Sequence, residues 1–513
     1  MAKVALALVG LLVIAAVGIV IAVLLVYIGL KKSPQINGVN IADAGPGYAY
    51  SAPVRVTAFV LLLALPVLVA IAFGIWWDRQ TRLKPIIIPV TAERSTKPGA
   101  ATNEGAVALI AQCDREISAK PNDPDAYRRR ANAYDETGDY DKAIADYDKA
   151  ITLKPNAESY YVCRGLSYAH KKDYDRAIED YDKAISLRAD DPDAYINRGI
   201  AYSDRAQYDK AIADYDRAIS LKPDYSTAYY DRGISYEAED KHDQAIADYD
   251  EAISLKPDGE NYYVNRGLAH ANKGDLDRAI ADYGKAIGLR PDDASAYYDR
   301  GNSYHAQKNY DQAIGDYNEA IRLAPDHPEY YLNRGLSNAG KLDYDEALRN
   351  YDAAISLKPD YASAYFDRGI CYEARQQHER AIADYDKAIS LKPDDESYYI
   401  NRGLCHAHRG DYDEAIRNYL TALTIKPDDQ DAYNDIGLSW AQKGAYDKAI
   451  ANYDTAIRLD PGYSRGYFNR GLAKESEGDR AGALNDLNRS LTLHTSPEMR
   501  EIAERHIRAL FGN

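Results

Sequence analysis

The sequence has few of the residues that disulfide-bonded or metal-binding proteins need. Its 513 residues include only 4 Cys, with no Cys-x-x-Cys pair, which argues against a disulfide framework and a zinc ribbon. Walker, H-E-x-x-H, G-x-S-x-G and dinucleotide-binding motifs are also missing. We therefore predict no catalytic residue, no cofactor and no metal site, and a protein that is not an enzyme. The best candidate metal ligands are Cys371, His378, Cys405, His406 and His408. We expect His406 to pack in the core instead.

Acidic residues outnumber basic residues over most of the chain. The first 100 residues carry nine Lys or Arg and three Asp or Glu, a net charge of +6. The other 413 residues carry 54 basic and 76 acidic residues, a net charge of −22. Nucleic-acid binding needs a high density of Lys and Arg to contact phosphates, so we predict no nucleic-acid partner.

Long uncharged runs occur only near the N-terminus. Val4 to Leu30 is 27 residues long and Val56 to Trp77 is 22, and either run is long enough to cross a bilayer as a helix. We predict that residues 1–77 form a two-helix transmembrane hairpin, with helices at about 4–30 and 56–77, followed by a linker over 78–103. A cleaved signal peptide is the alternative for the first run, but its apolar region would be shorter, at about 7–15 residues.

The basic residues around these runs predict their orientation. Six flank the two outer ends and three lie in the connecting loop, which favours both ends on the cytoplasmic side. We therefore expect a membrane protein with two spanning helices and a cytoplasmic body, in the inner or plasma membrane if the source is bacterial.

From Pro124 the sequence repeats every 34 residues through eleven units without an insertion. Position 4 of every unit is Tyr and position 20 is Ala, and Gly occupies position 8 in every unit but the first. Tyr is abundant, at 46 residues against 5 Phe and 2 Met, because it fills these repeated positions. The small and large residues recur at helical spacing, which predicts two antiparallel helices in each unit.

This pattern resembles the tetratricopeptide repeat: Tyr-x-x-x-Gly-x-x-Tyr, then Ala-x-x-x-Tyr-x-x-Ala, then Pro, on a period of 34. The resemblance implies an all-α fold, a right-handed superhelix of helix-turn-helix repeats whose first helices line a groove for partner proteins. We assign residues 104–123 to a degenerate half repeat, 124–497 to eleven repeats and 498–513 to a C-terminal capping helix.

Position 7 of the unit departs from the family pattern, because ten units have Arg where Leu is common. Position 23 is Asp or Asn, and the one unit with Ile436 instead of Arg also has the neutral Asn452. Since a buried guanidinium needs a partner, we predict a ladder of Arg–Asp or Arg–Asn bonds that fixes the register of each hairpin. The pairs assigned to this structural role include Arg198–Asp214, Arg266–Asp282 and Arg300–Asp316.

Positions 5 and 6 lie opposite the core face of the first helix, and we predict that they line the partner-binding groove. Position 6 alternates strictly between Asn and Asp from Asn197 onward, so the duplicated unit is a pair of repeats. An apolar stripe edged with carboxylates suits apolar, basic protein segments. Alternatively, these side chains only pack neighbouring helices and keep the solenoid soluble. The predicted groove residues are Ile196, Asn197, Tyr230, Asp231, Val264, Asn265, Tyr298, Asp299, Leu332, Asn333, Phe366, Asp367, Ile400 and Asn401.

These features predict a membrane-anchored protein–protein interaction scaffold, with its body at the cytoplasmic face and its anchor in the bilayer through residues 4–30 and 56–77. The alternatives are a recruiting or regulatory subunit of a membrane-associated enzyme complex, and a periplasmic envelope-assembly factor.

Overall fold

The computed structural model describes residues 35–36, 39–40, 100–493 and 496–511. The chain divides into two units, Met1–Arg94 and Ser95–Asn513. In the first unit, strands β1 (Gln35–Ile36) and β2 (Val39–Asn40) pair antiparallel, with Gln35 opposite Asn40. The predicted transmembrane helices at 4–30 and 56–77, and the linker up to residue 99, lie outside the described residues. Among the described helices, none is long and apolar enough to cross a membrane.

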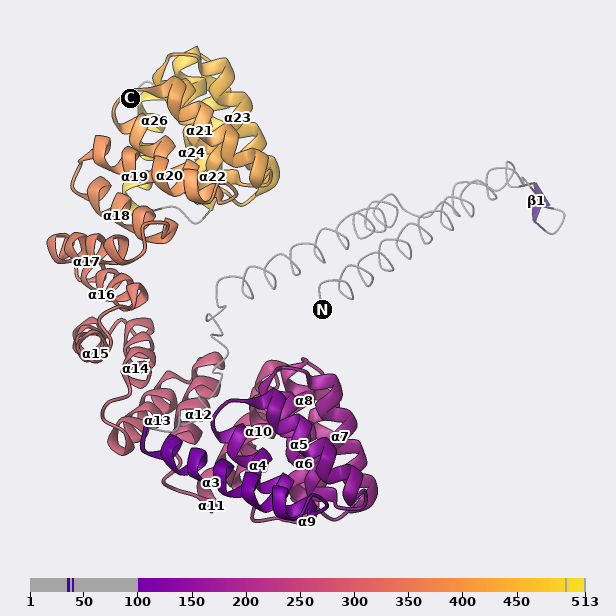
Figure 1. Ribbon diagram of the computed structural model, residues 1–513. Coiled ribbons are helices and arrows are strands. Elements are labelled where there is room, and N and C mark those ends of the chain that lie inside the picture. The colour runs from indigo at the N-terminus through magenta and orange to yellow at the C-terminus, as the bar shows by residue number, and fades with distance from the viewer. Residues whose placement is uncertain (1–34, 37–38, 41–99, 494–495, 512–513) are drawn as a thin grey trace. The chain divides into compact units, whose positions relative to one another are not determined.

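The second unit is the predicted all-helical repeat solenoid, with 24 helices, α3 to α26, in its described part (Figure 1). Each repeat contributes a first and a second helix, and consecutive helices pack against each other along the chain. The first helices are α4 (Pro124–Glu136), α6 (Glu158–His170), α8 (Pro192–Asp204), α10 (Ser226–Ala238), α12 (Glu260–Asn272), α14 (Ala294–Ala306), α16 (Pro328–Gly340), α18 (Ala362–Ala374), α20 (Glu396–His408), α22 (Gln430–Gln442) and α24 (Ser464–Glu477).

The second helices complete the hairpins, and one further helix flanks the repeats at each end. Helix α3 (Ala100–Ala119) packs against α4, and α26 (Pro497–Phe511) packs against the last second helix. The second helices are α5 (Tyr140–Leu153), α7 (Tyr174–Leu187), α9 (Tyr208–Leu221), α11 (His242–Leu255), α13 (Leu276–Leu289), α15 (Tyr310–Leu323), α17 (Tyr344–Leu357), α19 (His378–Leu391), α21 (Tyr412–Ile425), α23 (Tyr446–Leu459) and α25 (Arg480–Thr492).

Local sequence signals start and stop these helices. Asp191 caps α8 by accepting a hydrogen bond from the backbone N–H of Asp193, and Pro192 occupies the first turn, where its missing N–H costs nothing. Gly274, with φ of +81°, makes the tight turn between α12 and α13. A Pro two residues after nine of the eleven second helices prevents the helix from continuing.

The hairpin core is a large ring packed against a small residue. Tyr215, at position 24 of its unit, is 1% exposed, and its ring lies over Gly199 so closely that an added Cβ would stand 2.8 Å from Cε1. Ala211, at position 20, is fully buried beside it. The same arrangement recurs from unit to unit, so the predicted pairing of small and large residues holds each hairpin together.

Candidate functional site

The residues predicted to line a groove lie on first helices α8 to α20, two from each, and we call these fourteen residues the first-helix face. Ten of them are half-buried. The structure corrects the prediction for the other four, Ile196, Tyr230, Asp231 and Leu332, which are only 4–8% exposed and belong to the core. These four cannot contact a partner directly, so part of the predicted groove serves the packing of the repeats.

Aromatic residues at position 5 pack on the first helix of the next unit. The ring centroids of Tyr298 and Tyr330 lie 4.8 Å apart, and those of Phe366 and Tyr398 are also separated by 4.8 Å. Offset and tilted ring pairs of this kind stabilise the contact beyond the area they bury. The position 5 rings therefore stabilise the contact between neighbouring units, and those of Tyr298 and Phe366 remain half-buried.

The Asn residues of the alternating pattern link neighbouring units. Asn265 donates through Nδ2 to the hydroxyl of Tyr230 at 3.0 Å, and Asn333 donates to the hydroxyl of Tyr298 at 2.8 Å. Phe366 has no hydroxyl, and Asn401 donates instead to the carbonyl of Ser397 in its own helix. These bonds join a repeat with Asp at position 6 to the following repeat with Asn at position 6.

Two Asp residues of the same pattern, Asp299 and Asp367, have a raised pKa. Burial raises the pKa of Asp299 to about 7, with a further contribution from the nearby carboxylate of Asp293. Burial also raises the pKa of Asp367 to about 7. Among the residues that the structure describes, no lysine or arginine forms an ion pair with either side chain. A cation brought by a ligand would favour the ionised forms of both groups.

The arginines at position 7 form the predicted bonds to position 23. Arg198 donates to Asp214 through Nε at 2.8 Å and Nη2 at 2.6 Å, a bidentate geometry that favours Arg over Lys. Arg266 forms the same fork with Asp282 at 2.9 and 2.6 Å. Arg300 and Asp316 form it as well, at 2.8 and 2.7 Å. We call this repeated set the arginine ladder.

The sequence analysis missed a second partner of the ladder, the Asp at position 25 of the preceding unit. Nη1 of Arg198 donates to Asp182 at 2.5 Å, and Nη1 of Arg266 donates to Asp250 at 2.6 Å. The signal was present, because most units carry Asp sixteen residues before the next arginine. Each such arginine therefore holds its own hairpin and also ties it to the hairpin before.

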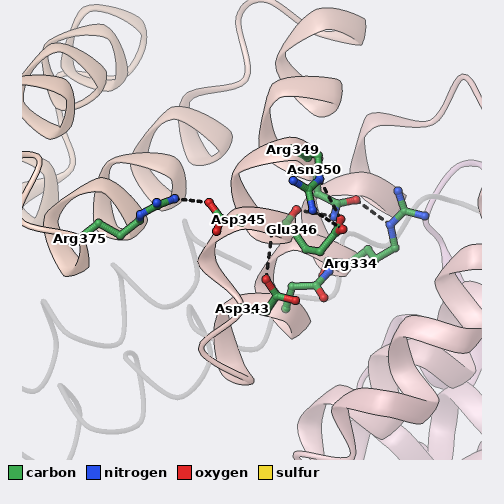
Figure 2. A network of polar contacts seen from close by, with 8 residues as sticks. Arg334, Asp343, Asp345, Glu346, Arg349, Asn350 and Arg375 are labelled. Atoms are coloured by element: carbon green, nitrogen blue, oxygen red, sulfur yellow. Dashed lines mark hydrogen bonds and ion pairs between the residues drawn. The ribbon is translucent and has the colours of Figure 1, made fainter.

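The ladder changes in the middle of the chain (Figure 2). Arg334 bonds to two amides instead of carboxylates, at 2.6 Å to Oδ1 of Asn350 and 2.7 Å to Oδ1 of Asn318. The amide nitrogen of Asn350 is turned away and donates to the carbonyl of Glu346. Burial lowers the pKa of Arg334, because its hydrogen-bond partners are neutral amides and the nearby Glu346 carboxylate offsets the desolvation only in part.

The candidate metal ligands do not assemble into a site. Cys371 and Cys405 are 1% and 0% exposed, and burial raises the pKa of each thiol to about 12. The rings of His378 and His408 approach to 5.5 Å, and His406 is half-buried next to Asp411. In the described part of the chain, no three His, Cys, Asp or Glu side chains lie close enough to hold a metal ion.

Comparison with protein families matches most of the repeat region to one family. Models described as tetratricopeptide repeat match residues 264–328, 332–397 and 406–464, residues 124–157, 192–225 and 226–258, and residues 370–434. A model described as TPR repeat matches residues 165–205. No curated protein matches the chain.

Several solved structures are similar to the chain, and one of the following three is described as a TPR protein. Yeast Tom70 is 16% identical over 75% of this chain and 95% of its own, with a TM-score of 0.37. YrrB, a TPR protein with an unusual peptide-binding site, is 24% identical over 36% of this chain and 96% of its own, with a TM-score of 0.33. MamA is 32% identical over 31% of this chain and 94% of its own, with a TM-score of 0.30.

Proposed function

The chain belongs to the tetratricopeptide repeat family and is a protein–protein interaction scaffold, and we propose that it binds basic, apolar segments of its partners at the cytoplasmic face of a membrane. Tetratricopeptide repeat proteins are generally non-enzymatic, and we extend this to the present chain. Any catalytic activity of a complex would then come from the bound partner protein.

The observation that carries the proposed partner type is the pair of carboxylates at Asp299 and Asp367. They occupy the same position two units apart, are half-buried, and form no ion pair with a lysine or arginine in the described part of the chain. A lysine or arginine from a partner would provide that cation in a partly desolvated setting, where the attraction is stronger than in water.

Apolar contact area on the same side of the first helices supports an apolar component in the partner. Ile370 lies four residues after Phe366 on α18 and is 40% exposed. Leu438 takes the same unit position on α22 and is 37% exposed. A segment that alternates basic and apolar residues would contact both the carboxylates and these side chains.

Peptide binding to the full chain tests the partner type. Two labelled peptides of equal length, one of Lys and Leu and the other of Glu and Leu, are titrated with the protein and followed by fluorescence anisotropy. We expect the Lys peptide to bind more tightly than the Glu peptide. The double variant Asp299→Asn, Asp367→Asn should weaken binding of the Lys peptide by about tenfold or more, because one to two partly buried ion pairs are lost. Equal binding of the two peptides would contradict the proposal.

Site-specific cross-linking tests the surface. A photoreactive residue at 370, on a first helix, is compared with one at 420, where Leu420 is 50% exposed on second helix α21. We expect the Lys peptide to cross-link at 370 and not at 420. Equal cross-linking at both positions would show that the first-helix face has no special role.

Membrane anchoring rests on the two uncharged runs at 4–30 and 56–77, and the cytoplasmic side rests on the basic residues that flank them. A reporter that is active only outside the cytoplasm, fused after Asn513, is expected to be silent. An active reporter would favour the periplasmic envelope-assembly factor instead. Extraction of the full chain from membranes by carbonate would contradict the anchor itself.

A further inference from the structure

The arginine ladder has a gap at Gly284. In most units Nη1 of the arginine donates to an Asp of the preceding second helix, as Arg266 does to Asp250 and Arg368 to Asp352, both at 2.6 Å. The corresponding residue before Arg300 is Gly284. None of the described residues accepts a hydrogen bond from Nη1 of Arg300, whose Nε and Nη2 are held by Asp316. A Cβ added at Gly284 would meet only this Nη1, at 3.7 Å. The guanidinium therefore points to the space that an Asp side chain fills elsewhere.

A second glycine enlarges this space. Gly288 follows Gly284 by one turn on the same face of α13, at a position where the other units have Ser, Thr or Arg. A Cβ at Gly288 would meet nothing within 4 Å, and neither glycine has a positive φ. Glycine in a helix interior is destabilising relative to alanine, and here neither close packing nor backbone conformation requires it. A glycine at these positions would still allow another group to approach the helix backbone closely.

The two glycines border a hollow of about 430 Å³. Its wall includes Lys285 and the ring of Tyr263, whose hydroxyl is held by the carbonyl of Pro257 at 3.2 Å. Lys285 thus lines the hollow, and Nη1 of Arg300 lies 3.7 Å from where a Cβ at Gly284 would stand, so two cationic side chains adjoin the place where the equivalent carboxylate is missing. The remaining lining residue is Leu289, which is 45% exposed and adds apolar surface.

We propose that this hollow on α13 binds a carboxylate of a partner protein, from an Asp or Glu side chain in a short segment lying across Gly284 and Gly288. The partner carboxylate takes the place of the Asp at position 25 and accepts from Nη1 of Arg300, while Lys285 adds a second cation. The equivalent nitrogens of Arg266 and Arg368 already donate to carboxylates in this geometry. The site is centred on α13 and uses none of the fourteen residues of the first-helix face, so it is independent of that face and of the partner proposed for it.

Binding of an acidic peptide to the full chain tests this site. A labelled peptide of Glu and Gly is compared with the same peptide carrying Gln, at low salt. We expect the Glu peptide to bind at least tenfold more tightly. Gly284→Asp should weaken it at least tenfold by filling the space and pairing with Arg300. Gly315→Asp is the matched control, because Gly315 is another helical glycine with nothing within 4 Å, and it should change binding less than threefold.

The outcomes separate the alternatives. Equal losses in Gly284→Asp and Gly315→Asp, or equal binding of the Glu and Gln peptides, would overturn the site. If a phosphoserine peptide binds more tightly than the Glu peptide, the hollow binds phosphate, and the proposal that it binds a carboxylate is wrong. Thermal unfolding shows whether Gly284→Asp is folded. Because the substitution restores an Arg–Asp bond, its unfolding midpoint should be at or above that of the wild type.

Discussion

Arg266 and Asp250 belong to neighbouring repeats, yet Nη1 of the arginine lies 2.6 Å from Oδ1 of the aspartate. The same guanidinium forms a fork with Asp282, so one side chain on α12 joins α11 and α13. The stability of a repeat protein is approximately a sum of terms within repeats and between neighbours. Arg266 contributes to both terms, so the arginine ladder stabilises single repeats and also the contacts between them.

Replacing Arg266 with Leu should destabilise the surrounding repeats by about 3 kcal/mol, because it leaves the buried carboxylate of Asp282 without a partner. Adding Asp282→Asn should recover much of this loss, whereas adding Asp250→Asn should recover little, since the Asp250 side chain is 56% exposed and stays hydrated. Hydrogen exchange of the α12 and α13 amides measures the local opening free energy. Strictly additive losses for Arg266→Leu and Asp282→Asn would contradict the pairing.

Asn350→Asp should stabilise the protein. Asn350 is 3% exposed and accepts from Arg334, whose pKa burial lowers because its partners are neutral. A carboxylate at 350 would restore the two-bond fork seen in the other units, and hydrogen bonds between charged groups contribute about 1.5–3 kcal/mol. The midpoint of thermal unfolding should rise.

The matched control for this substitution is Asn452→Asp. Asn452 has the same unit position, but Ile436 replaces the arginine in its repeat, and the amide donates to the carbonyl of Lys448. Both substitutions lose the amide's bond to a backbone carbonyl, but a carboxylate at 452 would have no guanidinium partner to offset that loss, so we expect the midpoint to fall. A rise of similar size in both variants would indicate a general charge effect and count against the ladder.

The sequence predicted the hairpins and the bonds within them because each depends on residues of one unit. Arg198 and Asp214 repeat together, and the loss of arginine at Ile436 coincides with the loss of charge at Asn452. The bond to Asp182 was missed because an exposed Asp on a helix of an acidic protein looks like a solubilising charge. Only the packing of one hairpin on the next brings it to Arg198.

The candidate face was predicted less completely, since helical periodicity gives the direction of a side chain but not the position of the next helix. Ile196 was predicted to lie opposite the core face, but it is 6% exposed and belongs to a core cluster with Tyr215 of its own hairpin and Ala228 of the next. Asp299 and Asp367 were recognised as acidic positions. Their raised pKa follows from burial between repeats, which the sequence does not reveal.

Gly335→Ala should destabilise the protein by about 1–3 kcal/mol, the usual cost of overpacking a core. The added Cβ would stand 2.6 Å from Cε1 of Tyr351, which is 1% exposed and has no room to move away. Gly315→Ala is the control: nothing lies within 4 Å, so the substitution should stabilise helix α15 by about 1 kcal/mol through helix propensity. Urea unfolding compares the two, and a stabilising effect of Gly335→Ala would contradict the tight ring contact.

The carboxylates of Asp299 and Asp367 should make the protein less stable as pH rises. Their pKa is about 7 in the folded state, against an ordinary value of 3.8, so the folded state binds more protons than the unfolded state between these limits. The free energy of unfolding therefore decreases as pH rises from about 4 to 7 and then levels off. Replacing both residues with Asn removes this dependence.

The double variant Asp299→Asn, Asp367→Asn should accordingly match the wild type near pH 4 and exceed its stability at pH 8. The gain should be on the order of 1 kcal/mol or more per site, because each unit of pKa shift corresponds to about 1.4 kcal/mol. Asp243→Asn is the control, since an ion pair with Lys273 lowers the pKa of that exposed carboxyl and its loss gives no gain at pH 8. Urea unfolding at pH 4, 6 and 8 gives the comparison. A double variant that is no more stable than the wild type at pH 8 would mean that water or a neighbouring cation already compensates both carboxylates, and a basic partner would then gain little from them.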